Sequence, residues 1–529
     1  EIGDIQVNTP ITKTGGGYVS LTLKAHNNVV VSNAISSTSN KLDINLVADS
    51  DKDGAGVVII NSNLTSNGGN IAFGTGSTIN FGGVTTQVGG DVYVTGSGGV
   101  TWATGGGSLS VYGQTLIGNA GGLTVNTSGG AVLFNGSIDS ANQYLGVTST
   151  LDWTSAVTAA ASGTGANTGD TYLATITTRL ENAIASQAVN YQSAWLGARR
   201  VTGIGTNTAW RWVTGPEGLQ NNGGVIFFYQ TLNGSSGSTV SGLFSNWGGS
   251  EPNNWTGGAG NSSLEYESAL QFTGALGQWN DLPKTTTTLS YYVKETNASP
   301  SPLSINAGAG AVTVQGAVGV SKALSTLSVT AGSKVNVNGG GLVTTGAQTF
   351  NQALGVTSST GNLQLGGAIT ASGSVTLSGD ALQINSGTSI STSGVGSLTV
   401  QPTSASFSSG LSWPISNLSV ATDITGLTLG KSGNTADITI GSNTSIAGPI
   451  TLYGGAINMN ANLATTNAAT GDVSITGVAG LTGSGNISVA DNRSLSVSQS
   501  GTSVYSGIMS GTGVSFTKGG TGSLTLTAT

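Results

Sequence analysis

Short apolar runs alternate with glycine, asparagine and serine turns over residues 1–139 and 298–529, as in Val29-Val30-Val31 and Leu123-Thr124-Val125. Brief β-branched runs bounded by turn-forming residues predict many short strands. Such strands cannot close a deep core locally, whereas coils stacked along an axis bury each apolar face against the next coil. We therefore expect the flanks to form a right-handed parallel β-helix, with an immunoglobulin-like array as the alternative.

The middle block, residues 140–297, has a different period. Apolar residues repeat every four positions from Leu180 to Ala188, and Thr178 with Glu181 three residues later fits a capping box. The alanine-rich segment 152–161 also predicts a helix, and seven of the nine tryptophans fall in this block. The pattern indicates an α/β unit inserted between two solenoid segments, so the expected fold class is mainly β.

Composition narrows the possible functions. Only 7% of residues are charged, against about 25% in ordinary proteins, and the formal net charge is −7. Nucleic-acid binding needs clustered Lys and Arg, so it is not expected. The absence of Cys excludes disulfides and thiol chemistry. No run of about 18 apolar residues exists, so this fragment should not insert into a membrane. Because the sequence starts at Glu1 without a signal peptide, we expect a piece of a larger exported protein.

Carboxylate and amide side chains gather between residues 251 and 281, in a chain with few charges. They include Glu251, Asn253, Glu265, Glu267, Asn280 and Asp281. Calcium takes about six to eight oxygen ligands from carboxylates, amide carbonyls and water. These side chains, if they converge across a loop, are therefore candidate calcium ligands.

The same stretch closely resembles the calcium and sugar site of C-type lectin domains, where EPN and WND motifs flank a glutamate. The motifs are Glu251-Pro252-Asn253 and Trp279-Asn280-Asp281. Further similar segments follow in the family's order: Tyr172–Ile176, Trp195–Gly197, Trp210–Glu217, Phe227–Phe228, Asn246–Trp247 and Tyr291–Glu295. The resemblance covers nearly all of residues 140–297 and departs from the family in lacking the disulfide cysteines of animal members.

This resemblance implies one calcium ion and a particular set of ligands. The implied ligands are Glu251, Asn253, Asn280 and Asp281, with either Glu267 or Glu265 as the fifth. We favour Glu267, because Ala269 and Leu270 then take the small and apolar positions that follow it. Pro252 is expected to follow a cis peptide bond.

The resemblance also implies sugar binding at the same ion. A vicinal diol replaces water on calcium, and Glu251, Asn253, Glu267 and Asn280 accept from and donate to its hydroxyls. The EPN order goes with mannose-, glucose- or fucose-type sugars, and Trp255 could stack on the sugar or serve as a lid or core residue.

The flanks resemble the β-helical shafts of bacterial adhesins of the filamentous haemagglutinin and autotransporter type. Tyr505–Gly513 and Phe516–Leu526 are together similar to the autotransporter-associated β-strand repeat. The resemblance implies a secreted or cell-surface bacterial adhesin whose partner is a glycan or a glycoprotein of a host or neighbouring cell. The alternative is a structural or protein-binding surface module without sugar binding.

An enzyme is not expected. A β-helical polysaccharide lyase or hydrolase needs clustered carboxylates, or a basic residue near acids, on the shaft face, whereas the charges of the flanks are scattered. His26, the only histidine, is expected on the shaft surface. Asp49, Asp51 and Asp53 resemble the start of an EF-hand loop, but Ile60 occupies the position of its bidentate glutamate. We therefore expect a solvated turn there.

Overall fold

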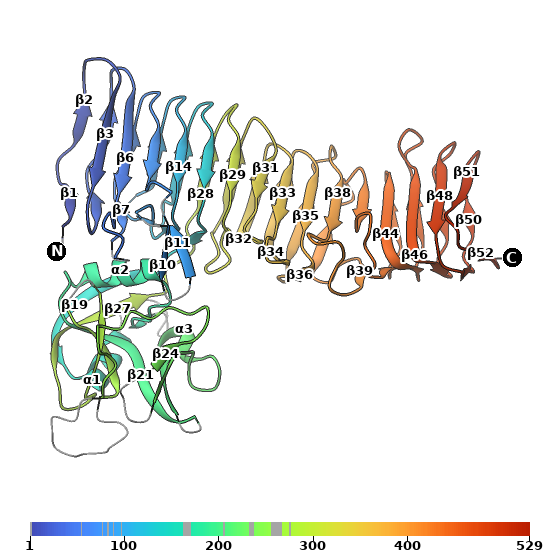
Figure 1. Ribbon diagram of the computed structural model, residues 1–529. Coiled ribbons are helices and arrows are strands. Elements are labelled where there is room, and N and C mark those ends of the chain that lie inside the picture. The colour runs from blue at the N-terminus through green and yellow to red at the C-terminus, as the bar shows by residue number, and fades with distance from the viewer. Residues whose placement is uncertain are drawn as a thin grey trace.

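The chain folds into a rod with one inserted unit. The computed structural model describes residues 3–53, 56–76, 78–81, 84–87, 89–96, 98–161, 171–204, 207–231, 237–254, 267–274 and 277–528. The two ends of the chain lie near opposite ends of the rod, and the inserted unit hangs from its N-terminal part (Figure 1). The rod is a parallel β-solenoid of about 21 turns.

Each turn of the rod contributes strands to long parallel ladders. The ladder that faces the inserted unit runs β1 (Ile5–Val7), β4 (Val29–Val31), β7 (Val58–Ile60), β12 (Val92–Val94), β15 (Thr115–Ile117) and β18 (Ile138–Ser140). The second runs β2 (Ile11–Lys13), β5 (Ile35–Ser37), β8 (Leu64–Thr65), β13 (Val100–Ala103), β16 (Leu123–Asn126), β28 (Leu303–Asn306), β30 (Leu327–Thr330), β32 (Gly341–Phe350), β34 (Asn362–Ala371), β37 (Thr388–Ser391) and β40 (Leu418–Val420), with β36 (Ala381–Ile384) beside β34.

The third ladder follows the whole rod. It comprises β3 (Val19–Lys24), β6 (Leu42–Val47), β9 (Ile71–Phe73), β14 (Leu109–Val111), β17 (Val132–Phe134), β29 (Val312–Val314), β31 (Val335–Val337), β33 (Leu354–Thr357), β35 (Val375–Ser378), β38 (Leu398–Gln401), β41 (Leu427–Leu429), β44 (Ile450–Met459), β46 (Val473–Gly483), β48 (Ser494–Gln499) and β51 (Ser515–Gly519). Near the C-terminus, β39 (Leu411–Trp413), β42 (Ile438–Ile440), β49 (Ser503–Tyr505) and β52 (Leu524–Leu526) extend it, and β43 (Thr444–Ile446), β45 (Leu463–Thr465), β47 (Ile487–Ser488) and β50 (Met509–Ser510) form a further ladder. The parallel pairing excludes the immunoglobulin-like alternative, whose sheets are antiparallel.

Alternating side chains of the ladders fill the interior of the rod. Val29 and Val31 are fully buried on either side of the outward-pointing Val30. Trp102 lies in the same core against Phe73, with ring centroids 4.5 Å apart. An antiparallel hairpin, β10 (Thr78–Phe81) with β11 (Val84–Gln87), departs from the parallel pattern in this part of the rod.

The inserted unit is a mixed sheet with helices against it. Its strands are β19 (Gln143–Leu151), β20 (Thr171–Leu173), β21 (Ala194–Ile204), β22 (Asn207–Trp212), β23 (Ile226–Thr231), β24 (Gly237–Thr239), β25 (Ala269–Phe272), β26 (Trp279–Leu282) and β27 (Leu289–Thr296). Strand β19, where the chain enters the unit, pairs antiparallel with β27, where it leaves. Because its entry and exit strands are neighbours, the unit can be inserted between two turns of the rod.

Both sequence-predicted helices are confirmed. Helix α1 spans Trp153–Ala161 and helix α2 spans Arg179–Ala188, while a short α3 spans Gly215–Gly218. The N-cap of α2 is Thr178, which accepts from the backbone N–H of Glu181, and the Glu181 side chain accepts from the N-cap backbone in return. The sequence pattern of a capping box therefore forms the complete motif. None of the helices in the described part of the chain is long and apolar enough to cross a membrane.

Helix α2 packs against the rod and fixes the inserted unit to it (Figure 1). Four outward-pointing residues of successive turns form what we term the docking stripe: Val30, Ile59, Tyr93 and Leu116. They share one apolar cluster with Leu180, Ala183 and Ile184 of α2. Each docking-stripe residue is at most 8% exposed although it points away from the core of the rod.

Polar contacts flank this apolar contact. Arg179, at the start of α2, pairs with Asp49 at 3.3 Å and with Asp91. Beyond the end of α2, the Tyr191 hydroxyl accepts from Asn27 Nδ2 at 2.7 Å and from the Asn28 side chain. The predicted fold class, a mainly β solenoid interrupted by an α/β unit, is thus confirmed.

Candidate calcium and sugar site

The β25–β26 hairpin fixes one half of the candidate site. In its register Leu270 lies opposite Asp281, and Gln271 lies opposite Asn280. The indole of Trp279 packs inside the unit, and its Nε1 donates to Asn182 Oδ1 of α2 at 2.8 Å. The WND segment is thereby held by both the sheet and the helix.

The other half is the loop that carries the EPN motif. Gly248 N donates to Trp279 O at 2.9 Å, and Glu251 N donates to Gly248 O at the same distance, so the loop is bound to β26. The Glu251–Pro252 peptide is cis, as predicted. The Pro252 carbonyl accepts from Gln230 Nε2 of β23 at 2.6 Å, a buried support that sequence reasoning missed.

Glu251, Asn253 and Asp281 meet between these two halves. The backbone N–H of Asn253 donates to Glu251 Oε2 and to Asp281 Oδ1, both at 3.1 Å. Asn253 Nδ2 donates to Glu251 Oε1 at 3.0 Å, and Asn254 N donates to Asp281 Oδ2 at 2.9 Å. A set of carboxylate and amide oxygens from separate segments therefore lies in one place.

Electrostatics make this place favourable for a cation. Burial and the nearby charge of Asp281 raise the pKa of Glu251 to about 7. Burial also raises the pKa of Asp281, against the lowering effect of its backbone N–H donors. A cation between these two carboxylates would favour the ionised form of both, because an opposite charge offsets the cost of burying a negative one.

The remaining predicted ligands have different positions. Glu267 is 6% exposed, and its backbone N–H donates to Asn254 Oδ1 at 3.2 Å, which brings it to the same loop. Asn280 is half-buried beside Asp281, and no hydrogen bond within the described chain joins its side chain to the other ligands. Glu265 and Trp255 lie outside the described residues.

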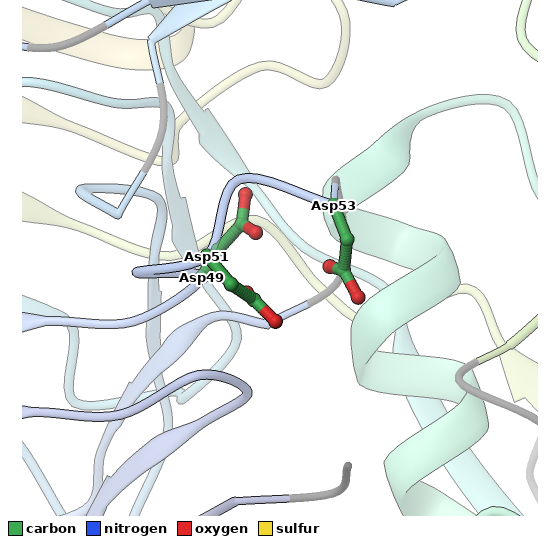
Figure 2. Close-up of side chains that lie close together, drawn as sticks. All are labelled: Asp49, Asp51 and Asp53. Carbon is green, nitrogen blue, oxygen red and sulfur yellow. The ribbon is translucent and has the colours of Figure 1, made fainter.

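A second acidic group lies at the junction of rod and inserted unit. Carboxylate oxygens of Asp49, Asp51 and Asp53 lie within 4.8 Å of one another, on one loop beside helix α2 (Figure 2). The expectation of a solvated turn holds for Asp51 and Asp53, which are exposed, but is wrong for Asp49, which is buried against Arg179. The guanidinium already compensates Asp49, so this group is part of the docking contact. His26 is exposed, as expected, and lies 3.8 Å from Asp51.

Comparisons with solved structures find C-type lectin folds. One is the C-type carbohydrate-recognition domain of cow CD23, determined with a GlcNAc2Man3 oligosaccharide, which aligns over 30% of this chain and 89% of that chain at 18% identity and a TM-score of 0.19. Another is that of the mouse scavenger receptor C-type lectin, over 30% and 92% of the chains at 19% identity and a TM-score of 0.20. At these values we draw no functional conclusion from the likeness. No protein-family model and no curated protein sequence matches the chain.

Proposed function

We propose that the inserted unit binds one calcium ion through Glu251, Asn253, Glu267, Asn280 and Asp281. The observation that carries this proposal is the meeting of Glu251, Asn253 and Asp281 across two segments, with two carboxylates in mutual contact. Carboxylate and amide oxygens are the donors that calcium takes. The donor set therefore fits the ion.

We further propose that a mannose-, glucose- or fucose-type glycan binds at the same place. A bound calcium would supply open coordination positions for two neighbouring hydroxyls. An ionised Glu251 can only accept hydrogen bonds, whereas Asn253 can both donate and accept. Side chains of these two kinds, side by side, match a pair of hydroxyls that each donate and accept.

The solenoid gives this site a mechanical setting. Because the docking stripe and Arg179 fix α2 to the rod, the site is carried on a stiff body. We propose that the chain is part of a secreted or cell-surface bacterial adhesin, without enzymatic activity, that binds a glycan or glycoprotein on another cell. One shallow site should bind weakly, and many copies on one surface would multiply its effect through effective concentration.

The metal proposal is tested by calorimetric titration of the full chain with calcium. Asp281→Ala removes a buried carboxylate of the proposed site and should abolish measurable calcium binding. The control is Asp51→Asn, which neutralises an exposed carboxylate of the other acidic group and should leave the affinity unchanged. Equal affinity in the parent and Asp281→Ala would rule the site out.

The sugar proposal is tested on a glycan array with calcium and with a chelator. The parent should be retained on mannose-, glucose- or fucose-type sugars only with calcium present. A double variant, Glu251→Gln with Asn253→Asp, exchanges acceptor and donor around the diol and should shift the preference toward galactose. If neither protein is retained on any sugar, the protein-binding alternative becomes the better account.

A further inference from the structure

Two arginines face each other on the sheet of the inserted unit. Arg199 of β21 lies directly opposite Arg211 of β22 in the antiparallel register. Like charges directly opposite each other on two strands are destabilising. The chain has only five arginines, so a pair in this arrangement requires a physical reason.

The other three arginines have polar partners. Arg179 and Arg493 form ion pairs with aspartates, and Arg200, buried on the opposite face of β21, donates to Thr208 Oγ1 at 2.9 Å. Within the described chain, Arg199 and Arg211 make no ion pair or side-chain hydrogen bond. Both are half-buried, and Arg211 Nε is enclosed with no acceptor among the described residues. A buried donor without an acceptor is unfavourable, and an anion in reach of it removes that cost.

A cavity of about 590 Å³ lies at this pair. Its volume is within the range of about 300–1,000 Å³ found for small-molecule sites. Val201 follows Arg199 by two residues on β21, which places both on one face of that strand. Val213 lies just past the end of β22, and both valines line the cavity. Trp153, at the start of α1, supplies a further apolar wall. The cavity thus combines two cationic groups with apolar surface.

We propose that this cavity binds an acidic saccharide unit, with its ring on the apolar wall and its anionic group between Arg199 and Arg211. The planar guanidinium offers two parallel N–H donors to a carboxylate or a sulfate, which makes arginine suited to such groups. Asn222, at the rim, adds an amide that can bind ring hydroxyls. None of these residues belongs to the calcium site, so this binding requires no calcium.

The experiment uses the full chain with a chelator present, so its result is independent of the calcium proposal. The probes are D-glucuronate and D-glucose 6-sulfate, with neutral D-glucose and inorganic sulfate as controls, each titrated by calorimetry or saturation-transfer NMR. We expect at least one acidic sugar to bind at least tenfold more tightly than glucose and than inorganic sulfate, and the tighter of the two identifies the anion. Equal binding of glucose, or of inorganic sulfate, would overturn the proposal, as would no binding of either acidic sugar.

Variants separate binding from a structural role. Arg199→Gln and Arg211→Gln should each weaken binding of the preferred acidic sugar at least tenfold. Arg211→Lys keeps the positive charge but loses the two parallel N–H donors of the guanidinium, so its effect should be intermediate. Because the opposing charges repel, the thermal unfolding midpoint of the ligand-free Gln variants should not fall below that of the parent. Arg493→Gln is the control for binding, since that arginine lies on the rod. A lowered midpoint without loss of affinity would assign the pair to structure and contradict the proposal.

Discussion

Glu251 and Asp281 lie close enough for their carboxyl groups to titrate as neighbours. The pKa of Glu251 is raised to about 7 by burial and by the charge of Asp281. Its folded-state pKa therefore lies above its unfolded value. In the calcium-free protein this group favours folding at acid pH, and that contribution is lost as the pH rises toward 7.

Calcium binding should show the opposite pH dependence. Carboxylate ligands must be ionised to bind the metal, so binding below pH 7 must release the proton of Glu251. We expect the affinity to be constant above about pH 7.5 and to fall by about tenfold per pH unit below the pKa, as removal of one proton requires. Calorimetry at several pH values, in buffers of different ionisation enthalpy, measures both the affinity and the released proton. An affinity that stays constant from pH 8 to pH 5 would contradict Glu251 as a ligand.

At this scale the sequence predicts contacts of segments that carry a recognisable motif and misses contacts of segments that carry none. The cis peptide before Pro252 and the meeting of Glu251 with Asp281 are expected from the resemblance of the EPN and WND segments. The burial of Asp49 is not, because its partner Arg179 lies 130 residues away. The pairing of Arg199 with Arg211 depends on a hairpin register that residue types alone leave open.

Among the elements, α2 connects the two parts of the molecule. Its existence is predictable because the capping box and the four-residue spacing are local signals. Its docking surface is not, since an apolar helix face indicates burial without naming the partner surface. The all-apolar runs Val29–Val31 and Val58–Ile60 indicate the partner surface. A strand covered on one face only would alternate apolar and polar residues, so these strands are covered on both faces.

The buried ion pair of α2 should contribute strongly to docking. Arg179→Met removes the cation that pairs with Asp49 and Asp91, and breaking a buried pair typically costs about 3–5 kcal/mol. Arg493→Met is the matched control, because the pair with Asp472 is partly exposed and should contribute about 0–1 kcal/mol.

Denaturant unfolding followed by tryptophan fluorescence measures this difference, since seven of the nine tryptophans lie in residues 140–297. We expect a clearly lower midpoint of the fluorescence transition for Arg179→Met than for Arg493→Met. Equal midpoints in the two variants would mean that apolar packing alone fixes α2 to the rod.

In the whole molecule, the rod continues across the insertion as if no residues intervened. Strand β28 pairs with β16, and β29 pairs with β17, so the ladders run on in register. The chain also leaves and re-enters the rod at one point, where Ser301 N donates to Ser140 Oγ at 2.9 Å. The strand pairing of the solenoid is therefore continuous without any strand of the inserted unit.

Replacing residues 142–299 by a short glycine linker should thus leave a folded rod with an unchanged β-sheet circular dichroism signal. It should also uncover the docking stripe, whose four side chains pack against α2 and Tyr144 of the inserted unit. We expect this deletion variant to bind a hydrophobic dye and to self-associate in light scattering, because exposed contiguous apolar surface drives association. A second deletion variant that also carries Val30→Thr, Ile59→Thr and Leu116→Thr should remain monomeric, since threonine suits an exposed strand position. If the deletion unfolds the rod, the inserted unit is needed for the solenoid to fold. If the first variant stays monomeric without binding dye, the docking stripe is not an apolar contact surface.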